Sequence, residues 1–127
     1  MKRDMELVRK ILLYIEENYK SNPIRHIDID GYSDKEIIYH CELLDDAGYL
    51  NEFEEIPWTG GVNGITIKGL SWYGHEFLDT IRNDTVWSKT KETITKNGLS
   101  ATVEVVKNVA TEILSIMTQA AIKGLTP

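Results

Sequence analysis

The 127-residue sequence has one cysteine, three prolines and no apolar run longer than Ile11–Ile15. A single cysteine cannot form an internal disulfide and fits a reducing compartment. The apolar run is far shorter than the roughly 20 residues of a membrane-spanning helix. A secretion signal also needs an uninterrupted apolar core, which charged residues such as Asp4, Glu6 and Arg9 prevent here. We therefore expect a cytoplasmic protein with no membrane contact.

Basic residues are scarce in one part of the chain. The whole sequence has 14 Lys and Arg against 20 Asp and Glu, which gives a net charge of −6. Residues 21–60 contain two basic and ten acidic side chains, whereas residues 1–20 and 61–127 each carry a net charge of +1. An acidic balance disfavours non-specific attraction to nucleic acid or anionic lipid. The remaining composition, 42% hydrophobic and 27% charged, is typical of a globular domain.

The first half of the chain predicts two helices and a hairpin. Asp4 is suited to cap a first helix that ends at Asn22-Pro23, and residues 27–30 alternate as in a short strand. Ser33 and Glu36 form a capping-box sequence for a second helix, which Gly48 ends. The buried face of this second helix is predicted to comprise Ile37, Ile38, Cys41, Leu44 and Ala47. Residues 49–56 and 65–68 predict two strands around the glycine-rich tip 59–64.

The second half predicts three further helices. Ser71 is suited to cap a third helix, which carries Trp72, Phe77, Leu78 and Ile81. A fourth helix is expected from Asp84 to Asn97-Gly98, and a last one from Ser100 to about Ile122. The order helix, strand, helix, hairpin, helices indicates an α+β, mainly helical fold, namely a winged-helix-like domain over residues 1–83 with C-terminal helices over 84–127.

Three segments carry a family resemblance. These segments resemble a family of short prophage and bacterial proteins known as domain of unknown function 2513. They are Met1–Leu12, Gly31–Leu50 with LLDDAGYL at its end, and LSWYGHEFLD at 70–79 followed by Trp87. The resemblance implies a phage or mobile-element context and no catalytic activity. More distantly, residues 38–50 resemble the recognition helix and following strand of winged-helix regulators. Those regulators have a further helix before the recognition helix, whereas here only residues 30–32 separate the expected strand from it.

Acidic side chains dominate the helix that would enter a DNA groove. Recognition helices normally present Arg, Lys, Asn or Gln to bases, and phosphates repel carboxylates. We therefore predict a protein-interaction surface that comprises Glu42, Asp45, Asp46, Glu52, Glu54, Glu55 and Trp58. Such a surface would bind a basic protein partner or act as a decoy for a nucleic-acid-binding protein. The alternative is a solvated face that maintains solubility.

A second hypothesis is a DNA-binding regulator. In it, Lys68, the hairpin tip, Lys89 and Lys96 contact phosphates, since Lys89 and Lys96 are seven residues apart and share a helix face. The alternative interpretation of these lysines is a solvated helix face.

The last helix has a heptad spacing that predicts assembly. Its apolar residues recur in steps of four and three, as in a coiled coil. We predict a homodimer whose interface comprises Val103, Val106, Ala110, Ile113, Met117 and Ala120. The alternative is one central core helix.

The residues for catalysis or metal binding are sparse. Three histidines and one cysteine lack metal-ligand spacing, so no metal, no cofactor and no enzymatic activity are expected. Cys41 is predicted in the core, and His75 as an interfacial or capping residue. The aromatic side chains are expected in the core as a group, with Trp58 as the one exposed interface anchor.

Overall fold

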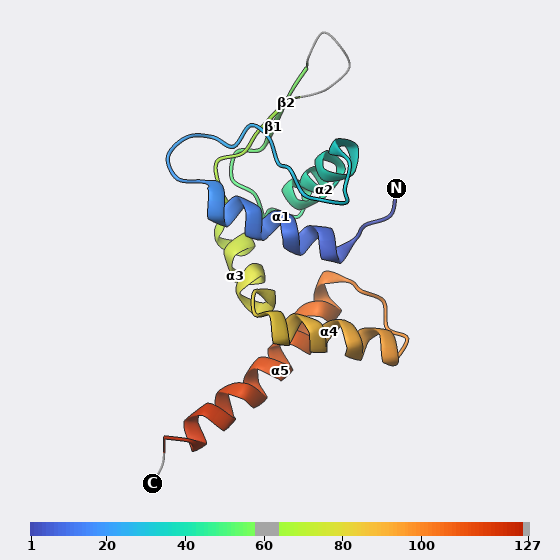
Figure 1. Ribbon diagram of the computed structural model, residues 1–127, viewed down its shortest axis with the longest axis vertical. Helices are drawn as coiled ribbons and strands as arrows, with labels where there is room; N and C mark the ends of the chain where they lie inside the picture. The colour runs from blue at the N-terminus through green and yellow to red at the C-terminus, as the bar shows by residue number, and fades with distance from the viewer. Residues whose placement is uncertain (58–63, 126–127) are drawn as a thin grey trace. The chain divides into compact units, whose positions relative to one another are not determined.

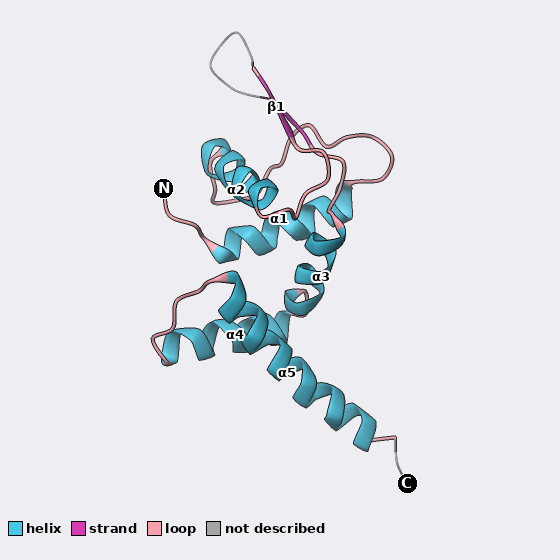
Figure 2. Cartoon of the chain, turned by 180° about the vertical axis from the view of Figure 1, so that it is seen from behind, coloured by secondary structure: helices cyan, strands magenta, loops and turns pink. Residues whose placement is uncertain are grey.

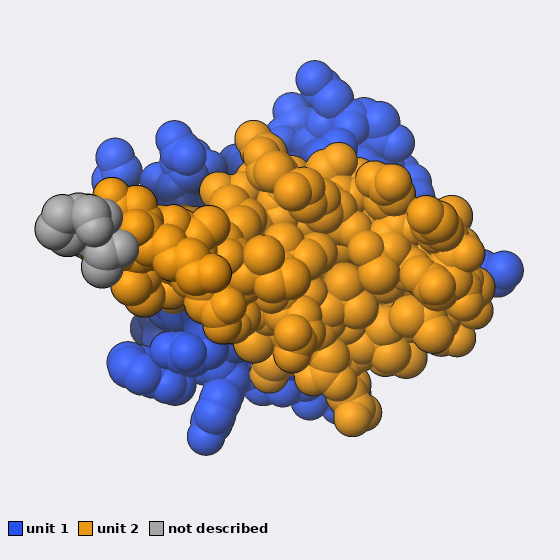
Figure 3. All heavy atoms as spheres, turned by 90° about the horizontal axis from the view of Figure 1, so that it is seen from below, with its two compact units in different colours: residues 1–78 blue, residues 79–127 orange. Residues whose placement is uncertain are grey.

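The computed structural model describes residues 1–57 and 64–125. In this part of the chain it has five helices and one two-stranded hairpin, which confirms a mainly helical α+β class (Figures 1 and 2). The chain divides into two compact units, Met1–Leu78 and Asp79–Pro127 (Figure 3). The boundary between them falls within helix α3, Trp72–Ile81. No helix in the described part has both the length and the apolar content needed to cross a membrane.

Helix α1, Met5–Asn18, begins where the sequence predicts and ends earlier. The Asp4 carboxylate accepts hydrogen bonds from the backbone N–H groups of Glu6 and Leu7 at 2.9 and 3.3 Å, which confirms the cap. The predicted end at Asn22-Pro23 is wrong, because Tyr19 already has an extended backbone with ψ of 120°. The helix buries its apolar stripe, which comprises Leu7, Val8, Ile11, Leu12 and Ile15.

Helix α2, Asp34–Asp46, has both predicted ends. Ser33 and Glu36 form the reciprocal capping box. Gly48 follows the C-cap with φ of +81°, where a side chain would be strained, and the Tyr49 N–H reaches the Leu44 carbonyl at 2.9 Å. Ile37, Cys41 and Leu44 are buried as expected and Ile38 is half-buried. Ala47 is exposed, contrary to the prediction, because it is the C-cap residue and lies off the buried stripe.

The hairpin is shorter than predicted. Strands β1, Glu54–Ile56, and β2, Gly64–Thr66, are antiparallel, with Glu55 opposite Ile65. An isolated bridge between Leu50 and Leu70 continues the pairing toward α3. Residues 59–63 of the predicted tip lie outside the described residues.

The predicted strand at residues 27–30 is wrong. Pairing occurs instead at Ile24, whose backbone forms an antiparallel bridge with Ile67 through N–O distances of 2.9 and 3.0 Å. Ile27 is nevertheless buried, with 2% of its surface exposed. The alternation of apolar and acidic residues therefore reflected burial of one side of a loop rather than strand pairing.

Helices α4, Asp84–Lys96, and α5, Val103–Lys123, pack against each other in the second unit. Asn83 caps α4, which ends at Asn97 and Gly98 as predicted. The predicted start of the last helix at Ser100 is wrong by a few residues, because the Thr102 hydroxyl accepts from the Val105 N–H and begins the helix there.

Candidate functional site

The C-terminal end of α2 presents two adjacent carboxylates to solvent. Asp45 and Asp46 are both exposed, and the last turn of the helix has no basic residue. A helix carries a partial negative charge at its C-terminus, so cations there are stabilising and anions are not. These two aspartates therefore lie where the field of their own helix is unfavourable to them.

Strand β1 adds two more carboxylates to the same unit. Glu54 and Glu55 are exposed, opposite Thr66 and Ile65 respectively. Together with Glu42, Asp45, Asp46 and Glu52, all of them exposed, they make up what we call the acidic surface. The sequence predicted this set, and the fold places its members on α2, on β1 and on the loop between them.

The fold brings Glu42 of α2 into contact with Glu55 of β1. The hydrogen bond between the two side chains raises the pKa of Glu42 above its usual 4.5, and burial and the negative charge of Glu55 raise it further. Two carboxyl groups held this close cannot both ionise without repulsion. The acidic surface thus contains a pair that favours one shared proton or a nearby positive charge.

Glu52 has a basic partner within its own unit. Its carboxylate lies 2.7 Å from the Lys68 ammonium, and both side chains are about half exposed. The hydrogen bond from Lys68 to Glu52 and the charge of Glu52 raise the pKa of Lys68. The Asn51 side chain donates to the Lys68 carbonyl at 3.0 Å and holds the two segments together. Lys68, predicted as a phosphate contact, therefore lies against a carboxylate.

The other two candidate phosphate contacts belong to the second unit. Lys89 and Lys96 are exposed on α4. Trp58, the predicted interface anchor, lies outside the described residues.

Two exposed aromatics were missed by the sequence analysis. Trp72 and Tyr73, at the start of α3, have 75% and 69% of their surface exposed, so the expectation that the aromatics form a core is wrong for them. Helical spacing could have indicated their exposure, because the buried positions Gly74, Phe77, Leu78 and Ile81 form one stripe along the helix. Trp72 and Tyr73 lie outside this stripe.

Three side chains of the first unit belong to types that can act in catalysis or metal binding, and two of them are buried. Burial raises the pKa of the Cys41 thiol to about 12, with further contributions from Glu42 and Glu55. His40 is buried and has partners on both ring nitrogens. His75 is exposed, with Nδ1 at 3.8 Å from a Glu16 carboxylate oxygen. The described residues hold no group of three or more His, Cys, Asp or Glu side chains placed to bind a metal ion.

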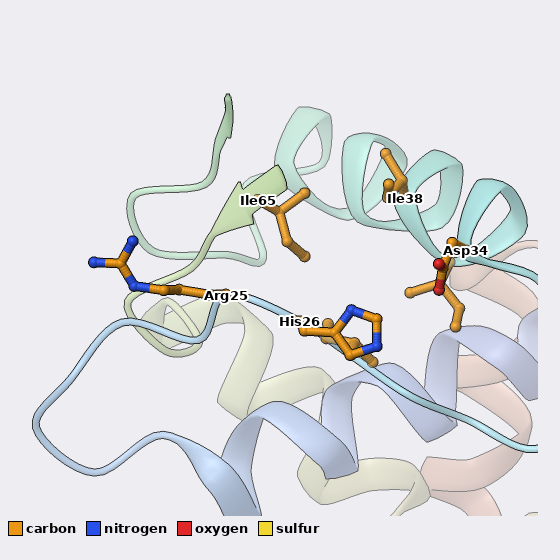
Figure 4. Close-up of a pocket in the computed structure, with 7 residues that line it drawn as sticks. Arg25, His26, Asp34, Ile38 and Ile65 are labelled. Atoms are coloured by element: carbon orange, nitrogen blue, oxygen red, sulfur yellow. The ribbon is translucent and has the colours of Figure 1, made fainter. Parts of the chain in front are cut away.

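A small, partly open pocket lies beside α2 and β2. It has a volume of about 40 Å³ and is lined by Arg25, His26, Ile27, Asp34, Ile37, Ile38 and Ile65. Figure 4 shows that the Arg25 side chain extends away from Asp34 and Ile38. Ligand pockets commonly measure about 300–1,000 Å³, so this pocket is of a size for water and not for an organic substrate.

The fold and surface define a small, mainly helical α+β protein with an acidic surface on its first unit. A family model described as "Hypothetical protein (DUF2513)" matches residues 2–100, and the chain belongs to this family. A Haemophilus influenzae protein described as uncharacterized is 37% identical over 120 residues, covering 92% of this chain and 98% of that protein. No solved structure matches the chain.

Proposed function

We propose that the protein is a non-enzymatic, winged-helix-like interaction module that binds a basic partner protein through the acidic surface. The observation that carries the proposal is the convergence of α2 and β1 carboxylates in the first unit, with Glu42 and Glu55 in direct contact. A phage or mobile-element setting, which the resemblance noted in the sequence implies, is part of the proposal.

The energetics of the acidic surface favour docking over simple solvation. Solvated carboxylates avoid one another and avoid helix C-termini, because both placements cost stability. Here Asp45 and Asp46 occupy the last turn of α2 and Glu42 contacts Glu55. A basic partner would relieve both repulsions at once, so part of its binding free energy would come from strain already present in the free protein.

The winged-helix-like part of the proposal has a topological basis. Two helices precede an antiparallel hairpin, and Ile24 joins that hairpin through its bridge with Ile67, as the first strand of a winged helix does. Residues 25–33 contain no helix, so the element that supports a recognition helix in winged-helix regulators is missing. In the proposed winged-helix-like domain α2 corresponds to the recognition helix, and its acidic side chains have the wrong sign of charge to approach phosphates.

The decisive experiment compares two variants with the same number of removed charges. The surface variant is Asp45→Asn, Asp46→Asn and Glu54→Gln, and the matched control is Glu76→Gln, Glu92→Gln and Glu104→Gln, three exposed carboxylates elsewhere. Proteins captured from host extract by the immobilised wild type are identified by mass spectrometry. The candidate partner is then purified and titrated against all three proteins. We expect tight binding by wild type and control, weakening with added salt, and a loss of at least about tenfold for the surface variant. Equal binding by both variants would remove the acidic surface from the proposal.

DNA binding remains the second candidate because Lys89 and Lys96 are exposed on α4. Titration of mixed-sequence duplex DNA at low salt tests it directly. Micromolar affinity that falls steeply with salt and falls again in a Lys89→Gln, Lys96→Gln variant would favour the regulator. Absence of binding at low salt would exclude this candidate.

A further inference from the structure

Helix α5 has two halves that differ in burial. In the first half, Val106 and Ala110 have 1% and 0% of their surface exposed. In the second half, Ile116 and Met117 have 64% and 37% exposed, and Ile122 has 57%. Among the predicted heptad positions, Val106 and Ala110 are therefore buried, Ile113 is half-buried, and Met117 and Ala120 are exposed.

The difference follows from the lengths of the two packed helices. Helix α4 has 13 residues and α5 has 21, so at about 1.5 Å per residue α5 is longer by roughly 12 Å. Figure 2 shows the C-terminal part of α5 continuing beyond α4. The apolar residues on the C-terminal part of α5 are therefore not covered by α4.

We propose that the second half of α5 is a self-association surface that binds the same segment of a second copy of this chain. The surface, which we call the α5 strip, comprises Ile113, Leu114, Ile116, Met117, Ala120 and Ala121. At about 100° per residue these six positions occupy less than half of the helix circumference, so one partner helix can cover them. This inference is independent of the acidic surface, which lies in the other unit.

The chemistry of the strip favours a copy of itself as the occupant. Residues 113–122, ILSIMTQAAI, contain no charged side chain. A basic or acidic partner would therefore find no complementary charge there, whereas two identical neutral strips bring no like charges together. Ala120 and Ala121 are small enough for two helix backbones to approach closely, and heptad spacing is the pattern of helix pairs.

Opposite charges at the two ends of the neutral segment specify an antiparallel pair. Glu112 precedes the segment and Lys123 follows it, and both project from the same edge of the strip at helical spacing. In an antiparallel two-fold pair centred on the segment, Glu112 of each copy lies within about one turn of Lys123 of the other copy. A closed two-fold dimer is also the commonest assembly of soluble proteins.

The first test compares substitutions on opposite sides of α5 in the full chain. Ile116→Glu and Met117→Glu each place a charge in the strip, and Ser115→Glu places the same charge on the opposite side of the helix. Molar mass is measured by light scattering over roughly a hundredfold range of concentration, and helix content by circular dichroism. We expect wild type and Ser115→Glu to reach dimer mass, and both strip variants to dimerise at least about a hundredfold more weakly with unchanged helix content.

Two outcomes overturn the proposal. A wild type that stays monomeric at every concentration means that no copy binds the strip, and a different protein or a lipid surface is its occupant. Dimers that persist in both strip variants place the interface elsewhere.

The second test addresses orientation. Glu112→Lys is expected to weaken the dimer several-fold by placing two lysines together at each end, and adding Lys123→Glu is expected to restore it. Failure of the double variant to recover affinity would overturn the antiparallel arrangement.

Discussion

At the scale of single residues, His40 joins the two N-terminal helices. Its Nε2 accepts a hydrogen bond from the backbone N–H of Asp4 at 2.8 Å, and its Nδ1 lies 2.7 Å from the Glu36 carbonyl. These partners assign the proton to Nδ1, which donates to the carbonyl. Asp4 is itself the cap of α1 and accepts from the Tyr32 hydroxyl at 3.2 Å. A buried histidine on α2 therefore fixes the start of α1.

His40→Ala should lower the free energy of unfolding by about 2–4 kcal/mol, because it opens a cavity and leaves the Asp4 N–H without its partner. Urea denaturation followed by circular dichroism measures the change. Lys35→Ala, an exposed position on the same helix, should change stability by less than about 0.5 kcal/mol. A loss below about 1 kcal/mol for His40→Ala would show that the link contributes little.

Cys41 offers a second test at residue scale. Its pKa of about 12 leaves almost no thiolate at neutral pH, and the thiolate is the reactive form. The native protein should resist alkylation by iodoacetamide at about pH 8, whereas the urea-unfolded chain should be alkylated at the rate of a free cysteine. Because the chain has one cysteine, the mass increase reports this site alone. Rapid alkylation of the folded protein would contradict the burial of the thiol.

At the scale of elements, the end of α2 and the start of α3 are fastened together. The Ser71 hydroxyl donates to the Gly48 carbonyl at 2.5 Å and accepts from the Gly74 N–H at 3.1 Å, so one side chain serves both helices. Gly74 lies directly against the Tyr49 carbonyl, and a Cβ at position 74 would clash with it. The close approach of these two helices explains the glycine in a helical position.

Gly74→Ala should destabilise the protein by roughly 1–3 kcal/mol, because the new methyl group forces α3 away from Tyr49. The sign of the stability change is informative, since helix propensity alone predicts that this substitution stabilises the protein by about 1 kcal/mol. Thermal and urea unfolding measure the change. A stabilised variant would mean that the two segments are not in contact.

The contact between α2 and β1 predicts a pH dependence. Because the pKa of Glu42 is raised in the fold, the folded protein holds a proton at pH values where the unfolded chain has lost it. This contribution to stability is present at low pH and is lost as the pH rises through the folded pKa. The gain in stability of Glu42→Gln over wild type should therefore grow between about pH 4 and pH 7, as measured by urea denaturation. Glu92→Gln, on α4, is the control and should not reproduce the trend.

At the scale of the whole molecule, charge is distributed unevenly. The net charge is −6, yet residues 21–60, which include α2 and β1, carry two basic and ten acidic side chains. Self-repulsion of this kind opposes the compact state and is screened by salt. The free protein therefore carries an electrostatic cost that an interaction with a basic partner would remove.

Raising sodium chloride from about 20 mM to about 500 mM should increase the free energy of unfolding of the wild type by roughly 0.5–1 kcal/mol. The gain should be smaller for the variant with Asp45, Asp46 and Glu54 neutralised. Chloride is the suitable anion, because sulfate strengthens apolar burial in any protein. Equal salt responses in both proteins would contradict the unfavourable electrostatics of the acidic surface.

Features that depend on a few neighbouring residues were predicted correctly. The caps at Asp4 and at Ser33 with Glu36, the turn at Gly48 and the presence of a hairpin, though not its length, all rest on hydrogen bonds between residues close in the chain. The acidic side chains of α2 and β1 are likewise visible in the sequence as a charge imbalance, and the structure shows that they are exposed. Their role in binding stays a prediction.

Features that depend on distant segments were not predictable in this way. The pairing of Ile24 with Ile67 and the contact of Glu42 with Glu55 each join residues from separate elements of the chain. The free energy of such a contact depends on which surfaces meet in the folded chain, and the order of neighbouring residues does not specify this.

The amino-acid order specified where most helices begin and end, and how its charges are divided, because capping bonds and side-chain ionisation are local properties. Packing of the folded chain specified which apolar positions of α5 are covered and which carboxylates touch. Burial depends on which segments are neighbours in space. Because α4 is shorter than α5, it covers only the first half of the heptad spacing on α5 and leaves the second half exposed.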